Sequence, residues 1–395
     1  MLWRISFQLI PLIALAAAVV FGIRPLRLPR CAWWITAVAF AIAFSKFAVF
    51  AIVGGDAFTP DLPAPVIWFL GWIYGAAMIF TAFACAVWVL DLVALAIRRQ
   101  VGLGLKRWRA AALAVAAVAI SLYGVFEGVR TPSVHRVEIF CSELPAAFDG
   151  YRIVHLSDLH CSSAARKPRF EAIVAHVNAL EPDLVAITGD FVDGKPRDRF
   201  DDIAPIGGIR ARDGVVGCTG NHEMYWNWNR WRGRLEGLGI VFLEEVGAKE
   251  ICRGEAEIAV GGIPDRAFFW NAEDWSAANA FAGVPEGAFK VLLCHRPFTT
   301  AIAAEKADVR LQLSGHTHGG AMPFLGWLVA KFNEGRLRGI HEFAPGRWLH
   351  ISPGTGQWAG FPLRLLNPAE ITEITLRHMD FGSSANCGQI PQSTP

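Results

Sequence analysis

Residues 151–160 read YRIVHLSDLH, an apolar, β-branched run that ends in an aspartate and a histidine. The run predicts a strand over 151–156, and the amphipathic stretch 170–180 predicts a helix after it. The segments 183–188 (DLVAIT) and 215–219 (VVGCT) predict two further strands of the same kind. Strands that alternate with helices and end in polar residues are typical of an α/β fold whose site lies at the carboxyl ends of the strands.

Five short motifs supply these polar residues, and the last two follow strands expected over 290–294 and 309–313. The motifs are Asp158-Leu-His160, Gly189-Asp190-Phe-Val-Asp193, Gly220-Asn221-His222-Glu223, Cys294-His295-Arg-Pro297 and Gly315-His316-Thr-His318-Gly-Gly320. A single Asp-X-His or Gly-Asn is most often a surface turn. His316 and His318 are more specific, because alternate residues of an extended segment point the same way and can bind one metal. The whole set, in this order, predicts a metal site.

The motifs offer seven metal-binding side chains, namely Asp158, His160, Asp190, Asn221, His295, His316 and His318. Oxygen and nitrogen donors of this kind suit Mn, Fe or Zn. The set suffices for two divalent cations if the carboxylate of Asp190 bridges them. Two cations roughly 3.5–4 Å apart activate water and stabilise both the attacking and the leaving oxygen of a displacement at phosphorus. The donor set therefore predicts hydrolysis of a phosphate ester.

The motifs resemble those of the calcineurin-like metallophosphoesterase superfamily over about residues 151–376. This resemblance implies a four-layer α/β/β/α sandwich of two mixed sheets. It implies one metal on Asp158, His160, Asp190 and His318, and a second on Asp190, Asn221, His295 and His316. It also implies that His222 is the general acid or the electrostatic partner for the departing oxygen and that Asp193 orients its imidazole. For Glu223 we expect a structural role and not a catalytic one. Gly194 stands where the protein-phosphatase branch has an arginine, which disfavours a phosphoprotein substrate.

The carboxyl-terminal stretch 352–376 is similar to that of bacterial membrane-associated phosphodiesterases of the superfamily. The similarity implies hydrolysis of phosphodiester or pyrophosphate bonds. By analogy, the substrate would be lipid-linked, such as a nucleotide-linked lipid of the UDP-acylglucosamine type. The alternatives are a phosphomonoesterase and a nonenzymatic membrane sensor or scaffold that binds metal without turnover.

The first 130 residues differ sharply from the rest of the 395-residue chain, because they contain no histidine and four long apolar stretches. These stretches, at about 5–23, 31–53, 66–90 and 110–126, are each near the roughly 20 residues of a spanning helix. We therefore expect a four-helix transmembrane region over 1–130 that anchors a catalytic domain over 131–380. The first stretch could instead be a signal peptide, and the last a buried or interfacial helix.

The charges between these stretches predict an orientation. Three arginines, Arg24, Arg27 and Arg30, lie between the first two stretches, and Arg98, Arg99, Lys106, Arg107 and Arg109 precede the fourth. Only Asp56 and Asp61 lie between the second and third stretches, and Lys46 is expected to reach the interface. The positive-inside rule then predicts a multi-pass inner (plasma) membrane protein whose catalytic domain is periplasmic or extracytoplasmic. A cytoplasmic catalytic domain is the alternative.

The remaining patterns in the sequence concern the partners of the chain, two aromatic segments and the carboxyl-terminal stretch. Residues 131–395 carry 26 Lys and Arg against 31 Asp and Glu, so the partners expected are the lipid bilayer and a phosphate ester, and not nucleic acid. The aromatic segments 224–231 and 324–328 either form a rim that meets the membrane or pack against the sheet. The stretch 381–395 is rich in Ser, Gly, Gln and Pro and predicts a disordered tail.

Overall fold

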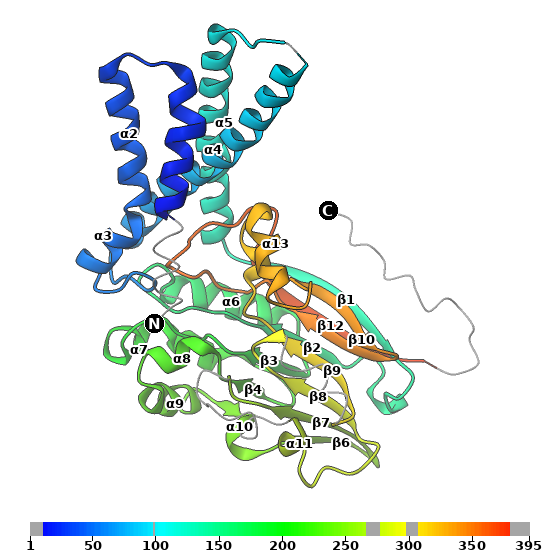
Figure 1. Ribbon diagram of the computed structural model, residues 1–395. Coiled ribbons are helices and arrows are strands. Elements are labelled where there is room, and N and C mark those ends of the chain that lie inside the picture. The colour runs from blue at the N-terminus through cyan, green and yellow to red at the C-terminus, as the bar shows by residue number, and fades with distance from the viewer. Residues whose placement is uncertain (1–10, 98, 266–276, 298–306, 380–395) are drawn as a thin grey trace.

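A computed structural model describes residues 11–97, 99–265, 277–297 and 307–379 of the chain. A helical bundle forms one end of the molecule, and a two-sheet α/β part forms the other (Figure 1). The predicted tail at 381–395 and residues 5–10 of the first predicted span lie outside the described residues.

Two helices of the bundle are long and apolar enough to cross a membrane. They are α4 (Ala64–Ala96) and α5 (Leu103–Val129), with 33 and 27 residues. They include the predicted spans 66–90 and 110–126 and extend beyond both. A spanning helix needs only about 20 residues, so both helices exceed the thickness of the hydrocarbon layer.

The other two predicted spans are less regular. The stretch predicted as the second span is broken into α2 (Arg30–Phe44) and α3 (Lys46–Val53), which are bent by 52° relative to each other. The apolar helix Pro11–Leu26 is shorter than a span. The described residues thus contain two candidate spans, or three if the bent pair is one span, and the expected four are not confirmed.

The connection before α2 and the start of α5 lie at the end of the bundle away from the α/β part (Figure 1), and most basic residues of the bundle belong to these two segments. The guanidinium of Arg107 donates to the carbonyls of Leu26 at 3.0 Å and Arg27 at 2.8 Å, which joins α5 to the segment before α2. The expectation that Lys106, Arg107 and Arg109 lie in a loop is wrong, because α5 already includes them. Lys106 and Arg109 instead pair with Asp91 of α4 from within the helix, so charge alone does not mark a loop.

The first sheet has six strands in the order β1-β12-β2-β3-β4-β5. Their bounds are β1 (Ser133–Cys141), β12 (Glu370–His378), β2 (Arg152–Leu156), β3 (Leu184–Thr188), β4 (Val215–Cys218) and β5 (Ile240–Phe242). Strands β2 to β5 are parallel, β1 is parallel to β12, and β12 is antiparallel to β2. The three strands predicted first are β2, β3 and β4.

The second sheet also has six strands, in the order β10-β11-β9-β8-β7-β6. Their bounds are β10 (Gly339–Ala344), β11 (Arg347–Ile351), β9 (Val309–Ser314), β8 (Phe289–Leu293), β7 (Ala256–Gly262) and β6 (Lys249–Arg253). The four central strands are parallel, and the two edge strands are antiparallel to their neighbours.

Alternating side chains of the strands build the layers. Ile153 and Leu184 face the core between the sheets, whereas their neighbours Val154 and Val185 pack against helices on the outer face. The helices on that face are α6 (Lys167–Ala179), α7 (Pro196–Ile203) and α9 (Trp228–Glu236); α11 (Ala277–Ala280) packs on the second sheet. Strands buried on both faces are apolar throughout, which is why the sequence shows continuous runs. The predicted mixed α/β architecture with two sheets is confirmed.

The segment 353–369, between β11 and β12, ties the α/β part to the bundle. Leu363 and Leu365 are buried in an apolar cluster with side chains of α4 and α5. Gly75 of α4 allows this contact, since a Cβ at that position would lie 2.3 Å from Cδ1 of Leu363. The backbone N–H of Arg364 donates to the carbonyl of Gly124 in α5 at 2.9 Å. The two parts therefore share one apolar interface.

Lys46, at the bend between α2 and α3, strengthens this junction. Its ammonium is fully buried and donates to the carbonyl of Gly360 at 2.7 Å. It also lies 4.0 Å from the ring centre of Phe47 and 4.4 Å from that of Tyr74, within the range of cation–π attraction. The expectation that Lys46 reaches the membrane interface is therefore wrong, because the segment 353–369 satisfies its charge inside the protein.

A pair of buried histidines links the two sheets and makes stability depend on pH. Nδ1 of His155 on β2 lies 2.8 Å from Nδ1 of His350 on β11, so one of them donates to the other. Burial, with His135 and His341 nearby, lowers the pKa of His350 to about 3, and burial holds the pKa of His155 well below its usual range. Below a pH of about 6.5 the unfolded chain binds protons that the folded chain cannot, so stability falls as the pH falls.

We expect the thermal midpoint of the full chain to fall more steeply between about pH 7 and about pH 4 in the wild type than in His350→Gln, since glutamine keeps a hydrogen-bonding group but does not titrate. Circular dichroism in detergent with chelator measures this slope. His176→Gln, which removes an exposed histidine of α6, should retain the wild-type slope. Equal slopes in the wild type and His350→Gln would contradict the conclusion that the buried histidine pair makes stability depend on pH.

Candidate metal centre

The predicted ligands lie in loops that follow the parallel strands of both sheets. The loops after β2, β3 and β4 carry Asp158, His160, Asp190 and Asn221, and those after β8 and β9 carry His295, His316 and His318. Carboxyl ends of parallel strands meet at one edge of a sheet, and the two sheets present these edges to each other. The structure thus brings all seven predicted side chains into one region.

Five of the seven have a left-handed backbone, with φ of 52° at Asp158, 46° at His160, 53° at Asp190, 70° at His316 and 47° at His318. Such a conformation costs a non-glycine residue on the order of 1–3 kcal/mol. Hydrogen bonds between the loops hold it, including those from the N–H of Asp158 to the carbonyl of Gly189 at 3.0 Å and from the N–H of His160 to that of Asp190 at 2.9 Å. Strain of this kind is typical of a functional site.

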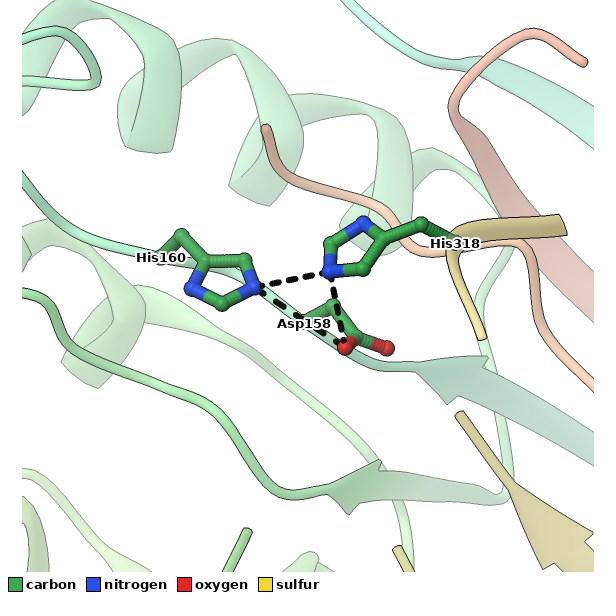
Figure 2. A group of neighbouring side chains, drawn as sticks. All are labelled: Asp158, His160 and His318. Carbon is green, nitrogen blue, oxygen red and sulfur yellow. Dashed lines mark hydrogen bonds and ion pairs between the residues drawn. The ribbon is translucent and has the colours of Figure 1, made fainter. Parts of the chain in front are cut away.

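Asp158, His160 and His318 form the first group of ligand atoms (Figure 2). Nε2 of His160 lies 3.1 Å from Nε2 of His318 and 3.8 Å from Oδ1 of Asp158, and the latter two atoms are 3.4 Å apart. Donors about 2.0–2.2 Å from one cation are separated by roughly these distances. The three groups point at one spot, as a metal site requires.

Asp190, His295 and His316 form the second group. Nε2 of His295 lies 3.2 Å from Oδ2 of Asp190 and 3.3 Å from Nδ1 of His316. Oδ1 of Asn221 is buried and has no hydrogen-bond partner among the described residues. An unsatisfied buried amide oxygen is costly unless a cation binds it, so Asn221 fits this group.

Oδ2 of Asp190 lies between the two groups. It is 3.2 Å from Nε2 of His295 in the second group and 3.8 Å from Nε2 of His160 in the first. The other oxygen, Oδ1, accepts a hydrogen bond from the N–H of His222 at 2.9 Å. One carboxylate oxygen is therefore available to both groups, as expected for a bridging ligand.

The carboxylate of Asp193 lies against two imidazoles. Its Oδ1 forms a short hydrogen bond with Nδ1 of His222, and its Oδ2 lies 2.9 Å from Nδ1 of His160. Both contacts leave Nε2 of the imidazole directed into the site. The sequence predicted the partner His222, but not that Asp193 also orients His160.

Two further contacts fix the ligands from behind. Glu223 accepts hydrogen bonds from the N–H groups of Asp190, Phe191 and Gly220 at 2.7–2.9 Å, which supports the structural role expected of it. Nδ1 of His295 lies 2.7 Å from the carbonyl of Thr188 and donates to it, which leaves Nε2 for a metal.

The charges of the site favour metal binding. Burial opposes ionisation of Asp190, but the surrounding histidines, His295 first, hold the pKa of its carboxyl well below the usual value. Burial lowers the pKa of both His316 and His318, so these imidazoles are neutral, the form that binds metal. Asp190 outweighs burial at His295 and raises its pKa to about 10, so metal binding there releases a proton.

His222 differs from the ligand histidines in charge. Burial disfavours its imidazolium, but Asp193 and Asp190 outweigh burial and raise the pKa of His222 to about 9. The same contact, again against burial, lowers the pKa of Asp193 to about 2. His222 therefore holds a proton beside the two ligand groups, where its Nε2 lies 3.9 Å from Oδ2 of Asp190.

The ligands line a cavity of about 200 Å³, and its wall includes further residues that were not expected there, although Tyr225 belongs to the aromatic segment 224–231. Asp56, Phe58 and Thr59 belong to the segment between α3 and α4, and Tyr225 and Trp358 complete the wall. The bundle therefore contributes to the cavity. No motif marks these residues, and the only signal was that Asp56 lies on the side of the bundle expected to face the domain.

The arginines near the metal ligands make contacts within the protein. Arg364 is buried and donates to the carbonyls of Pro353 at 2.7 Å and Gly356 at 2.8 Å. Arg296 bonds to Asp265 at 2.6 Å and lies 3.2 Å from Nε2 of His316. Among the described residues that line the cavity, none is Lys or Arg.

The two aromatic segments near the motifs, 224–231 and 324–328, differ in how far their side chains are buried. Trp231 is fully buried, and Trp228 packs on Phe242, so this part of 224–231 belongs to the core. The second segment begins α13 (Pro323–Lys331), which lies next to the bundle (Figure 1). Trp327 and Phe332 are 71% and 72% exposed there, as expected of side chains at a membrane interface.

Fold and donor set together define a metal-binding α/β hydrolase. The family described as calcineurin-like phosphoesterase matches residues 151–320, so the chain contains a calcineurin-like metallophosphoesterase domain, and this family uses divalent metal ions. A "Transmembrane protein with metallophosphoesterase domain" from Danio rerio is 32% identical over 276 residues, which cover 67% of this chain and 62% of that protein. The protein of the same description from Bos taurus is 29% identical over 268 residues, covering 65% and 60%.

Bacterial relatives share the domain as well. An "Uncharacterized metallophosphoesterase" from Helicobacter pylori is 30% identical over 264 residues, which cover 64% of this chain and 66% of that protein. The chain matches less than two thirds of the length of each of these three relatives. The homologues named as transmembrane proteins and the two apolar helices together indicate a membrane protein.

We expect Gly220→Ala to weaken metal binding by about 10–100-fold, because a Cβ there would lie 2.3 Å from Oδ1 of Asp190 and displace this carboxylate. Titration calorimetry with Mn²⁺ and metal analysis of the purified chain measure the effect. Gly233→Ala on α9, where a Cβ meets nothing within 4 Å, is the matched control and should bind metal like the wild type. Wild-type affinity in Gly220→Ala would show that Asp190 does not bind the metal in this position.

Proposed function

We propose that the chain is a membrane-anchored phosphoesterase that uses two divalent cations, Mn, Fe or Zn, to hydrolyse phosphodiester or pyrophosphate bonds. The observation that carries this proposal is the position of Oδ2 of Asp190, 3.2 Å from a ligand of one group and 3.8 Å from a ligand of the other. A carboxylate shared in this way is the arrangement that holds a pair of cations. The ligand sets implied by the family agree with the two groups of atoms.

Cations bound at these groups would supply Lewis acidity, which activates water and polarises the phosphoryl group. The residues of the chain do the rest. His222 holds a proton on the imidazole that faces the site, and Asp193 fixes the orientation of that imidazole. Transfer of this proton to the departing oxygen would make the leaving group neutral.

The lining of the cavity favours a diester over a monoester. A monoester carries about two negative charges at neutral pH, whereas a diester carries one. The described lining contains no Lys or Arg beyond the metal ligands, and Asp56 adds a negative charge. Apart from the bound cations and His222, the second negative charge of a monoester would find no positively charged partner in this lining, and Asp56 would oppose it. The volume of about 200 Å³ also implies that a nucleotide-linked lipid of the UDP-acylglucosamine type would lie mostly outside the cavity.

For the membrane arrangement, we propose four spans within residues 1–130, with the catalytic domain 131–380 outside the cytoplasm at the inner membrane. Support comes from the basic residues at the far end of the bundle, where Arg107 contacts Leu26 and Arg27. The positive-inside rule assigns such an end to the cytoplasm. Exposed Trp327 and Phe332 on α13 fit contact with the lipid surface and a lipid-linked substrate.

The first test is hydrolysis by the purified full chain. With Mn²⁺ we expect turnover of an aryl phosphodiester faster than of the matching aryl monoester. Asp190→Ala should abolish turnover, because the second ligand group loses a member and both groups lose the carboxylate that lies between them. His222→Ala should lower kcat by about 10²–10⁴-fold while metal content stays unchanged, as for loss of a general acid.

His176→Gln, outside the site, serves as the control for these variants. Faster turnover of the monoester would favour the phosphomonoesterase alternative. If the wild type and all variants were equally inert with bound metal, the nonenzymatic sensor or scaffold would be favoured instead.

The second test concerns orientation. Cys252 on β6 is exposed, whereas Cys141, Cys161, Cys218 and Cys294 are buried. In a variant that also carries Cys31→Ser and Cys387→Ser, a membrane-impermeant maleimide should label Cys252 in intact cells. A further Cys252→Ser change should remove the label. Labelling that requires permeabilised cells would place the catalytic domain in the cytoplasm.

A further inference from the structure

The wall of the cavity opposite the metal ligands is built by the bundle. Asp56, Phe58 and Thr59 lie in the ten-residue connection 54–63 between α3 and α4, which we call the capping loop. Trp358, from the segment that joins the α/β part to the bundle, lies beside them. Any group attached to a phosphate at the metal ligands must therefore meet this loop.

The capping loop is fixed by its own hydrogen bonds. Oδ1 of Asp56 accepts from the N–H of Phe58 at 2.7 Å, from the N–H of Thr59 at 2.9 Å and from the hydroxyl of Thr59 at 3.2 Å. This single oxygen shapes the turn and keeps the carboxylate at the cavity wall.

The loop is also held by the catalytic domain. The hydroxyl of Ser163 donates to the carbonyl of Pro60 at 2.7 Å, and Arg199 forms a short ion pair with Asp61. The rings of Phe58 and Trp358 stack with centres 5.9 Å apart and planes 13° apart. A wall held at both ends is rigid enough to select among substrates.

The chemistry of this wall suits an organic cation. It combines one carboxylate, Asp56, with the aromatic side chains Phe58, Tyr225 and Trp358, and the described lining has no Lys or Arg. Asp56 belongs to none of the groups of metal-ligand atoms found among the described residues, so its charge is not needed for the metals. Aromatic faces and a carboxylate are what binds an alkylated ammonium group. Near bound divalent cations, an ammonium also needs a negative charge to offset their repulsion, and Asp56 supplies it.

The size of the cavity limits the group further. Its volume of about 200 Å³ is below the roughly 300–1,000 Å³ of typical small-molecule sites. A phosphate with a two-carbon amino alcohol is of suitable size, whereas a sugar nucleotide or an acyl chain is not. The remainder of a lipid substrate would then lie outside, towards the membrane.

We propose that the capping loop forms a subsite for the cationic amino alcohol of a phosphodiester, with Asp56 as its specificity-determining residue. The substrate class is thus a phosphodiester of choline or ethanolamine type, such as the head group of a zwitterionic lipid. This inference rests on the proposed phosphodiesterase function and names its substrate.

The test compares two substrates that differ in one atom. The full chain with Mn²⁺ is assayed on p-nitrophenyl phosphocholine and on p-nitrophenyl 3,3-dimethylbutyl phosphate, in which carbon replaces the quaternary nitrogen. We expect kcat/KM to be about tenfold higher for the cationic ester, which corresponds to the range of cation–π and ion-pair attraction. Asp56→Asn keeps the oxygen that shapes the loop but removes the negative charge. It should raise KM for the cationic ester, so that the ratio of kcat/KM for the cationic ester to kcat/KM for the neutral-chain ester comes close to one.

Two further variants complete the design. Phe58→Leu keeps an apolar side chain but removes the aromatic face, and it should lower the ratio by about half or more. Glu250→Gln, which removes a charge from an exposed position on β6, is the matched control and should keep the wild-type ratio. Metal content and thermal midpoint report whether each variant is folded.

The outcomes separate the two proposals. Equal hydrolysis of both esters by the wild type, or a ratio unchanged in Asp56→Asn, overturns the subsite and leaves the phosphodiesterase proposal standing. Absence of turnover on both esters, and on the simple aryl phosphodiester, overturns the phosphodiesterase proposal and the subsite with it.

Discussion

The site depends on the carboxylate of Asp190, because it touches every other part of the centre. Its Oδ2 faces both groups of ligands, and its Oδ1 accepts the N–H that begins α8 (Asn221–Tyr225). Glu223 in turn holds the N–H of Asp190, so the loops after β3 and β4 determine each other's conformation. A buried carboxylate surrounded by imidazoles is stable only as an anion, and an anion in that place attracts cations. The conformation of these two loops and the affinity of the site for cations are therefore linked.

This arrangement strains the backbone of the ligand loops, and the buried strands of the two sheets offset that strain. Five ligands adopt left-handed conformations that each oppose folding by on the order of 1–3 kcal/mol. The strands that precede them are buried on both faces, which places large apolar areas on either side of each strained turn. Inter-loop hydrogen bonds, such as that from Gly315 to the carbonyl of His295 at 2.9 Å, then restrict the turns to one conformation. Strain at this edge is tolerated because the adjacent strands are fixed.

Whether a feature could be predicted from the sequence depends on how far apart along the chain the interacting residues lie. Strands β2, β3 and β4 and the ligands after them were predictable, because a buried strand and the polar turn that ends it are local patterns. Lys46 was not, because the group that satisfies its charge, the carbonyl of Gly360, is 314 positions away. The capping loop was missed for the same reason, since nothing near Asp56 in the sequence indicates a metal site. The break between α2 and α3 also escaped, because the bend carries no Pro or Gly and its one charged residue, Lys46, was expected to reach the membrane interface.

The junction between bundle and domain gives the membrane region a role beyond anchoring. Lys46 holds Gly360, two residues from Trp358, and Trp358 stacks on Phe58 of the capping loop. The same segment carries Arg364, whose guanidinium lies 3.4 Å from Nδ1 of the ligand His318. The positions of the bundle helices are thus linked, through the segment 353–369, to both the cavity wall and His318. A shift of α3 relative to α4 would therefore move the cavity wall and His318 together.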